Sequence, residues 1–163
     1  NCVWVLTKND RYNPFLSANT VKALGASNLE RIDPQGEEGL PSEDLFGQEN
    51  KNTWCYYFEK ADLARQTKDW PEVTRLYNEA ETKGYEPGNG IEMMPFIEGF
   101  ARTGGAKKSL QLTIDATKKT DNISPFLCDN WNRFAPDLFD DASVQEAYQT
   151  FSKDYGCSIY LEK

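Results

Sequence analysis

Charged side chains at helical spacing are the residues of this sequence best suited to bind a ligand. Glu59 and Asp62 lie three positions apart, as do Asp62 and Arg65, and Glu98 and Arg102 lie four apart. On a helix, such pairs share one face. A groove lined by them would hold a peptide or a sugar through hydrogen bonds. The spacing leaves a second interpretation open, that of ordinary surface ion pairs worth about 0.5 kcal/mol each.

Two of these carboxylates also raise the hypothesis of a glycoside hydrolase. Retaining enzymes of this kind hold two carboxyl groups about 5.5 Å apart, and Glu59 and Glu98 are the candidates if their helices face each other. However, the chain has 26 acidic residues, so some pair will always look suitable. The enzyme is therefore the minor hypothesis, and we predict no catalytic residue.

The composition argues against several other kinds of site. The 163-residue chain has no histidine, which excludes Ser-His-Asp triads, Cys-His dyads and histidine metal ligands. Its net charge of −8, from 26 acidic and 18 basic residues, argues against nucleic acid as a partner. We predict no metal and no cofactor, since Asp140 and Asp141 lack the alternating ligands of an EF-hand. The turn at residues 88–90 also lacks the preceding strand of a dinucleotide loop.

The four cysteines, Cys2, Cys55, Cys128 and Cys157, leave the redox state of the chain open. Three disulfide pairings are possible, and the sequence does not choose among them. Buried, unpaired thiols are an equally good interpretation. Because Cys2 and Cys157 each begin a strand-like run, a bridge between the two ends of the chain is one option.

The first 52 residues are expected to form a small cap and a loop. Residues 2–6 are rich in Val and Trp and predict a buried strand, and the alternation over 28–32 predicts a second. Ser17 is expected to cap a short helix that ends before Gly25. Turn residues mixed with acids over 33–52 predict a long acidic loop.

From Thr53 onward, apolar residues recur at steps of three and four, which predicts six helices. Ser143, followed three positions later by Glu146, predicts a capping box for the last of them. Residues 157–161 predict a final strand, which would pair with the N-terminal strands. The helices are expected at about 54–69, 70–83, 92–102, 106–118, 124–135 and 143–155.

The first four of these helices resemble two tetratricopeptide repeats. Such repeats are helix pairs with a period of about 34 residues, and Trp70 and Ala106 hold matching positions 36 residues apart. Val73 departs from the pattern, which usually has alanine there, and the second repeat is degenerate. The residues that carry the resemblance are Ala61, Ala64, Asp69, Trp70, Tyr77 and Ala80.

In tetratricopeptide repeats, the first helix of each pair lines a concave groove. The resemblance therefore implies that one groove contains the six charged and polar residues of these helices. This set of candidate binding residues comprises Glu59, Asp62, Arg65, Gln66, Glu98 and Arg102.

Most of the chain also resembles a second group of proteins, through four segments that occur in a fixed order. The segments are residues 2–6, 27–32, 54–64 and 95–101. They resemble the soluble C-terminal domain of bacterial multi-pass membrane glycosyltransferases of the protein mannosyltransferase and aminoarabinose transferase types. The resemblance implies that the catalytic residues lie in another part of a membrane protein. It also implies that this domain is extracytoplasmic and tethered to the membrane.

We therefore expect a mainly α fold of tetratricopeptide-like antiparallel hairpins, with a small β element from the chain ends. Its parts would be an N-terminal β/α cap with the acidic loop (1–52), two hairpins (53–121) and a C-terminal helical cap with a final strand (122–163). The expected function is non-catalytic binding of a protein, a peptide or a glycan acceptor. A carboxylate-based glycan-processing enzyme and a structural brace for a membrane portion are the alternatives.

Overall fold

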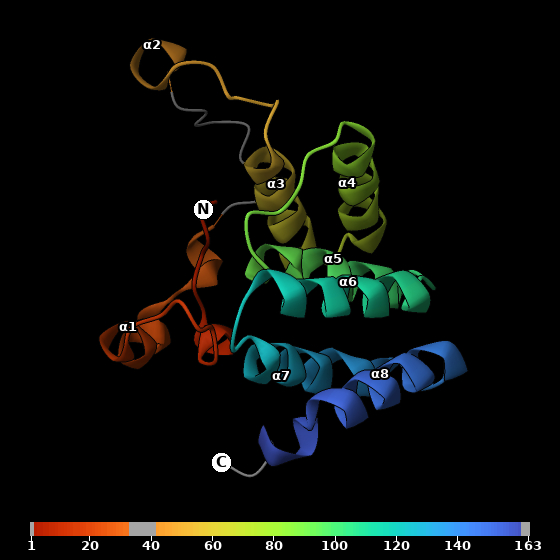
Figure 1. Ribbon diagram of the computed structural model, residues 1–163. Coiled ribbons are helices and arrows are strands. Elements are labelled where there is room, and N and C mark those ends of the chain that lie inside the picture. The colour runs from red at the N-terminus through yellow and green to blue at the C-terminus, as the bar shows by residue number, and fades with distance from the viewer. Residues whose placement is uncertain (1, 33–41, 161–163) are drawn as a thin grey trace.

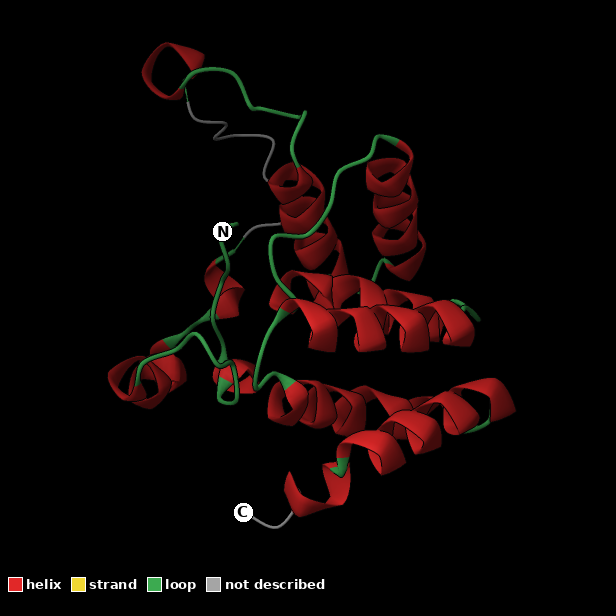
Figure 2. Ribbon diagram, in the orientation of Figure 1, coloured by secondary structure: helices red, strands yellow, loops and turns green. Residues whose placement is uncertain are grey.

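The computed structural model describes residues 2–32 and 42–160, and all regular structure in those ranges is helical (Figures 1 and 2). This confirms a mainly α fold. The α-helices are α1 (Ala18–Ala23), α2 (Glu43–Phe46), α3 (Trp54–Gln66), α4 (Trp70–Thr82), α5 (Met94–Arg102), α6 (Ala106–Lys119), α7 (Ser124–Phe134) and α8 (Ala142–Tyr155). Short 3-10 helices occupy Lys8–Asp10, Leu24–Ala26, Leu29–Arg31, Ile91–Met93, Ala135–Leu138 and Cys157–Tyr160.

The predicted β element is wrong for the described residues. Residues 2–6 form no strand, and Val3 and Val5 are 75% and 40% exposed rather than buried. Residues 29–31 and 157–160 form 3-10 helices instead, while residue 161 lies outside the described ranges. The valine-rich composition predicted strands, but no neighbouring strand offers a hydrogen-bond ladder. The backbone amide of Val3 donates to a side chain, Glu59, instead.

Helices α3 to α6 form two hairpins that pack on each other (Figure 1). Thr53 caps α3 by accepting from the amide of Tyr56, and Asp69 caps α4 by accepting from the amide of Glu72. Each hairpin has a three-residue turn, 67–69 or 103–105, which forces its two helices to run antiparallel. Helix α4 lies against α5, α7 lies against α5, and α8 lies against α6.

The apolar residues at helical spacing on α3, α4 and α7 that are named at the end of this paragraph are predicted to face inward, and every one of them is buried. On α6 the spacing predicts Leu110, Ala116 and either Ile114 or Thr113 as inward. Thr113 and Ala116 are buried, whereas Leu110 is only half-buried and Leu112 is buried in addition. A hydroxyl is tolerated there because Thr113 accepts a hydrogen bond from the indole of Trp131 at 3.0 Å. The confirmed buried residues are Trp54, Tyr57, Phe58, Ala61, Ala64, Val73, Leu76, Tyr77, Ala80, Leu127, Cys128, Trp131 and Phe134.

The ends of α8 show one confirmed prediction and one error. Gly156 ends the helix in the left-handed conformation, with φ of 65°, as expected. The capping box of Ser143 and Glu146 is wrong, because the cap lies two residues earlier. Asp141 is the cap and accepts from the amide of Ser143 at 2.8 Å. The carboxylate of Asp141, rather than the hydroxyl of Ser143, therefore accepts the hydrogen bond from a first-turn amide, which a negative charge at a helix N-terminus favours.

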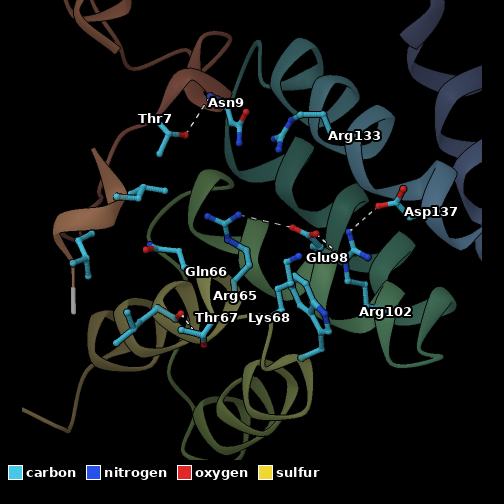
Figure 3. Close-up of a pocket in the computed structure, with 14 residues that line it drawn as sticks. Thr7, Asn9, Arg65, Gln66, Thr67, Lys68, Glu98, Arg102, Arg133 and Asp137 are labelled. Carbon is cyan, nitrogen blue, oxygen red and sulfur yellow. Dashed lines mark hydrogen bonds and ion pairs between the residues drawn. The ribbon is translucent and has the colours of Figure 1, made fainter. Parts of the chain in front are cut away.

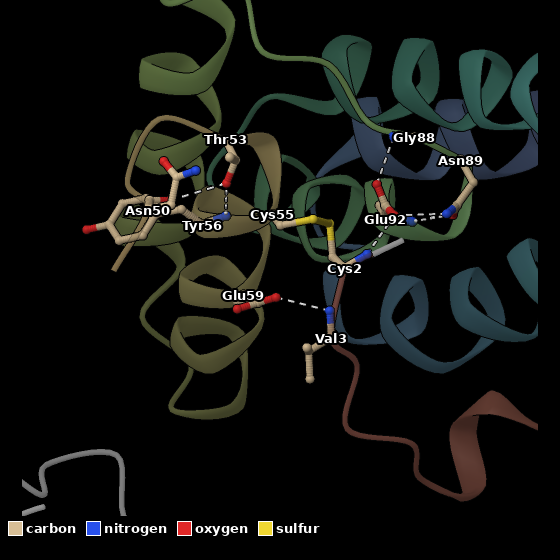
Figure 4. The surroundings of a disulfide bond; sticks show 10 residues. All are labelled: Cys2, Val3, Asn50, Thr53, Cys55, Tyr56, Glu59, Gly88, Asn89 and Glu92. Carbon is tan, nitrogen blue, oxygen red and sulfur yellow. Dashed lines mark hydrogen bonds between the residues drawn. A yellow bond between two sulfur atoms is a disulfide. The ribbon is translucent and has the colours of Figure 1, made fainter. Parts of the chain in front are cut away.

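All four cysteines are paired in two disulfides, Cys2–Cys55 and Cys128–Cys157. Unpaired thiols and a bridge between Cys2 and Cys157 are therefore both wrong. The second bridge fastens the C-terminal 3-10 helix to α7. The first fastens the N-terminal segment to the beginning of α3 (Figure 4).

The N-terminal segment (residues 2–32) lies beside α3 and α7 (Figure 1). The indole of Trp4 packs on Phe58 of α3 at 5.2 Å and on Phe126 of α7 at 6.3 Å, measured between ring centroids. Arg11 forms an ion pair with Asp129 of α7. The segment therefore bridges α3 and α7, and the aromatic contacts of Trp4 hold it there.

The acidic loop lies partly outside the described residues, which exclude 33–41. Residues 42–52 include the short helix α2 (Glu43–Phe46), which was not predicted. In the ranges 2–32 and 42–160, no helix is both long enough and apolar enough to cross a bilayer.

Candidate binding cleft

An open cleft of about 440 Å³ lies where the N-terminal segment meets the ends of four helices (Figure 3). We call it the binding cleft. The N-terminal segment contributes one wall, and α3, the turn after it, α4, α5 and the region of α7 contribute the rest. Its lining residues are Thr7, Asn9, Leu29, Ile32, Leu63, Arg65, Gln66, Thr67, Lys68, Trp70, Glu98, Arg102, Arg133 and Asp137.

Four of the six candidate binding residues line this cleft: Arg65, Gln66, Glu98 and Arg102. Asp62 does not line it but lies behind it, 6% exposed, and accepts hydrogen bonds from two of the lining residues. Glu59 lies elsewhere. It is exposed, and its carboxylate accepts from the amide of Val3 at 3.0 Å (Figure 4). The helical spacing placed Glu59 correctly on α3, but the N-terminal segment engages it.

Two carboxylates, those of Asp62 and Glu98, hold the guanidinium of Arg65 in place. Its Nε and Nη2 donate to Oδ1 of Asp62 at 2.9 and 2.8 Å, while Nη1 lies 3.9 Å from Glu98. Burial lowers the pKa of the guanidinium, but the neighbouring acids, first of all Asp62, raise it by more, so the net shift is upward. Arg65 is therefore a permanent cation whose orientation is fixed before any ligand arrives.

Arg102 is fixed in a similar way on the opposite side of the cleft. Its Nε donates to Glu98 at 2.8 Å, and Nη2 lies 3.6 Å from Asp137. The guanidinium also lies over the ring of Trp70, with its central carbon 4.8 Å from the ring centroid. A cation over an aromatic face is stabilised electrostatically. Glu98 thus connects Arg65 on α3 with Arg102 on α5.

Two further cations line the cleft and were missed by the sequence reasoning. Lys68 lies in the turn after α3, in the left-handed conformation with φ of 61°. Arg133 lies on α7, where Asp129 accepts from its Nε at 3.3 Å. The repeat pattern points to the first helix of each pair, so it predicts neither a turn residue nor a residue of α7 as part of the site. The signal for Arg133 was available, because Asp129 precedes it by four positions.

The charges of the cleft have a consistent arrangement. Four cations and two acids, Glu98 and Asp137, line it, while Asp62 and Asp129, the acids that hold Arg65 and Arg133, lie outside the lining. The acids therefore orient the guanidinium groups, and the lining has more cations than acids. In a chain of net charge −8, this concentration of cations in one concavity is a local reversal of sign.

A second, much smaller cavity of about 20 Å³ lies beneath the cleft, lined among others by Asp10, Asp62 and Arg65. Burial raises the pKa of the Asp10 carboxyl, although hydrogen bonds from Thr7 oppose this and Asp62 adds to it. The cavity has room for about one water molecule. Asp10 also accepts from both the amide and the hydroxyl of Thr7 at 2.7 and 3.1 Å. This acid closes the N-terminal turn.

No cluster of three or more potential metal ligands occurs among residues 2–32 and 42–160. No protein family, no curated protein and no solved structure matches the chain.

Proposed function

We propose that this domain is a non-catalytic binding module that takes an acceptor or a partner segment in its binding cleft. The observation that carries the proposal is the convergence of four cations from three separate parts of the chain: Arg65 and Lys68 at the end of α3, Arg102 on α5 and Arg133 on α7. These three parts are too far apart in sequence to be gathered by helix periodicity, so the tertiary structure must assemble them.

The cleft also has the volume of a small-molecule binding site, although its lining is mainly polar. Small-molecule sites measure about 300–1,000 Å³ and combine apolar surface with a few oriented polar groups. This cleft measures about 440 Å³ and combines Leu63 and Trp70 with oriented guanidinium groups. We see no arrangement for acid catalysis by Glu59 and Glu98, because each is engaged by different partners on different segments.

We further propose that the hairpins are tetratricopeptide-like and that the domain belongs to a membrane glycosyltransferase-like protein, on its extracytoplasmic side. Two sequence resemblances support this, the repeat pattern of residues 53–121 and the ordered segments from residue 2 to residue 101. The disulfides Cys2–Cys55 and Cys128–Cys157 fit an oxidising compartment. In such a protein, the cleft would hold the acceptor while chemistry proceeds elsewhere.

A nuclear magnetic resonance titration of the oxidised, isotope-labelled chain tests the binding function. The probes are maltotriose, glucuronic acid, glucose 1-phosphate and a hexaglutamate peptide. We expect at least one probe to shift the backbone amides of Gln66, Thr67 and Lys68, which line the cleft, and each probe to be recovered unchanged.

A blocking variant and a matched control locate the binding. Asn9 is an exposed residue of the cleft wall, so Asn9→Trp should fill part of the cleft and weaken binding. Lys107, exposed on α6 and outside the cleft lining, provides the control Lys107→Trp, which should bind as the wild type does. Shifts that avoid the cleft, or that survive Asn9→Trp, would contradict the assignment, and turnover of a glycan probe would refute a non-catalytic role.

A further inference from the structure

The side of the helical stack along α3, α5 and α7 is already occupied in part by the chain's own N-terminal segment. Cys2 is bonded to Cys55 of α3, and its amide lies 3.4 Å from Glu92, just before α5 (Figure 4). Trp4 then packs on α3 and α7. An extended peptide ligand cannot lie along the whole of this side, because the disulfide-bonded N-terminal segment already occupies part of it.

The binding cleft lies next to this segment, which contributes Thr7 and Asn9 to its lining. Its lining comes from the N-terminal segment, the end of α3, the start of α4, α5 and the region of α7, so it is bounded on several sides (Figure 3). Such a shape suits a compact ligand better than a helix or a long peptide.

The cations of the cleft specify the charge of that ligand. The Nε of Arg102 donates to Glu98, and its guanidinium lies over the ring of Trp70. Its Nη2 approaches Asp137 only to 3.6 Å. Lys68 has no ion-pair partner within residues 2–32 and 42–160 and is exposed. Guanidinium groups present paired N–H donors that match carboxylate and phosphate oxygens. Since neighbouring acids already orient Arg65 and Arg102, binding an anion would cost little side-chain entropy.

The neutral residues of the cleft suit hydroxyl groups. Gln66 donates through its Nε2 to Asp62 at 3.1 Å, while its carbonyl oxygen has no partner in the described part of the chain. The side-chain amide of Asn9 likewise has none among the residues that the structure describes. Amide groups beside an indole, here that of Trp70, provide hydrogen bonds for hydroxyls and an apolar surface for C–H groups.

We propose that the binding cleft recognises a compact, hydroxylated anion, namely a sugar acid or a sugar phosphate. Arg102 and Lys68 contact the carboxylate or phosphate oxygens, and Asn9 and Gln66 contact the hydroxyl groups. This inference rests on the proposed function, since it names the class of ligand for the same cleft. Carboxylate and phosphate share the chemistry that the guanidinium groups recognise, and the experiment separates them.

The experiment measures dissociation constants by the same titration for glucuronic acid, glucose 1-phosphate, neutral glucose and hexaglutamate. We expect one or both of the charged sugars to bind at least about tenfold more tightly than glucose, because hydrogen bonds to charged groups contribute that much. Tighter binding of glucuronic acid identifies a carboxylate ligand, and tighter binding of glucose 1-phosphate identifies a phosphate ligand. Either result supports the proposal.

Three variants assign the effect to named residues. Arg102→Lys keeps the charge but loses the planar fork and should weaken binding of the charged sugar about tenfold. Lys68→Asn suits the left-handed backbone at this exposed position, so it should fold normally and still weaken binding. Arg75 is an exposed arginine of α4 that is also paired with two glutamates but lies outside the cleft. Arg75→Gln should therefore leave the dissociation constant of the charged sugar unchanged.

The outcomes that overturn the inference are distinct from those that overturn the proposed function. If glucose binds as well as the charged sugars, or hexaglutamate alone shifts the cleft amides, the domain is still a binding module but not one for sugar anions. Unchanged affinity in both Arg102→Lys and Lys68→Asn would equally refute the contacts assigned here. If no probe shifts the cleft amides, both the inference and the proposed function are wrong.

Discussion

Gly99 of α5 lies directly against Val73 of α4. A methyl group on Gly99 would come within 2.5 Å of Cγ1 of Val73 and 3.2 Å of its Cβ. Val73 is completely buried, so it has no free space into which it can turn. The contact sets how closely the two hairpins approach. The glycine opposite makes room for the branched side chain of Val73.

Gly99→Ala should therefore destabilise the chain. Alanine is favoured over glycine in a helix by about 1 kcal/mol, but overpacking a filled core costs about 1–3 kcal/mol, so we expect a net loss of about 1 kcal/mol. Urea denaturation measures it. Adding Val73→Ala should make the glycine substitution less costly. In the control Gly25→Ala the new methyl meets only the side chain of Lys8, at 3.7 Å. Equal effects at the two glycines would contradict the close approach.

The Cys2–Cys55 bridge should stabilise both the fold and the wall of the cleft. It closes 53 residues of chain, whereas Cys128–Cys157 closes 29, and the loss of either should cost about 2–4 kcal/mol. Replacing Cys2 and Cys55 together by alanine avoids a free thiol. We expect faster amide hydrogen exchange at Thr7 and Asp10, which follow the released segment.

The paired replacement of Cys128 and Cys157 by alanine is the matched control for that experiment. It removes a bridge of similar kind, but one that joins α7 to the C-terminal 3-10 helix. Exchange at Thr7 and Asp10 should then stay slow under conditions where the chain remains folded. Equal exchange at these amides in both double variants would show that the N-terminal bridge has no special effect on the cleft wall.

Asp10 should make the stability depend on pH in an unusual direction. Burial raises the pKa of its carboxyl above the ordinary value of 3.8, although hydrogen bonds from Thr7 work against the shift. The stability that the protonated form contributes is fully present below the unfolded pKa and is lost as pH rises through the folded pKa. Asp10→Asn does not titrate, so its stability relative to the wild type should increase from pH 3 to pH 7.

Asp141 provides a control of opposite sign. Hydrogen bonds from the hydroxyl and the amide of Ser143 lower the pKa of its carboxyl. Its contribution to stability is present above the unfolded pKa and is lost as the pH falls. Asp141→Asn should therefore lose stability relative to the wild type between pH 3 and pH 7. Urea denaturation at both pH values measures the two trends, and trends of the same sign would contradict the pKa assignment of Asp10.

The helices of the hairpins could be predicted because their signals are local. The period of apolar residues from Trp54 to Ala80 defines two buried faces, and Asp69 followed by Trp70 and Pro71 marks where one helix ends and the next begins. The cleft was predictable only in part. Helical spacing linked Glu98 to Arg102, but it assigned Glu59 to a ligand because nothing in the sequence shows that Val3 takes its carboxylate.

The sequence by itself determined the helical class of this protein, the positions of most helices and the residues of their buried faces. Periodicity and capping act within a few residues, so a linear reading detects them. Only the tertiary structure decided that Cys2 pairs with Cys55, that Trp4 lies between α3 and α7, and that Lys68 and Arg133 join Arg65 around one cleft. These contacts depend on how separate segments fit together in space, and no local pattern specifies that fit.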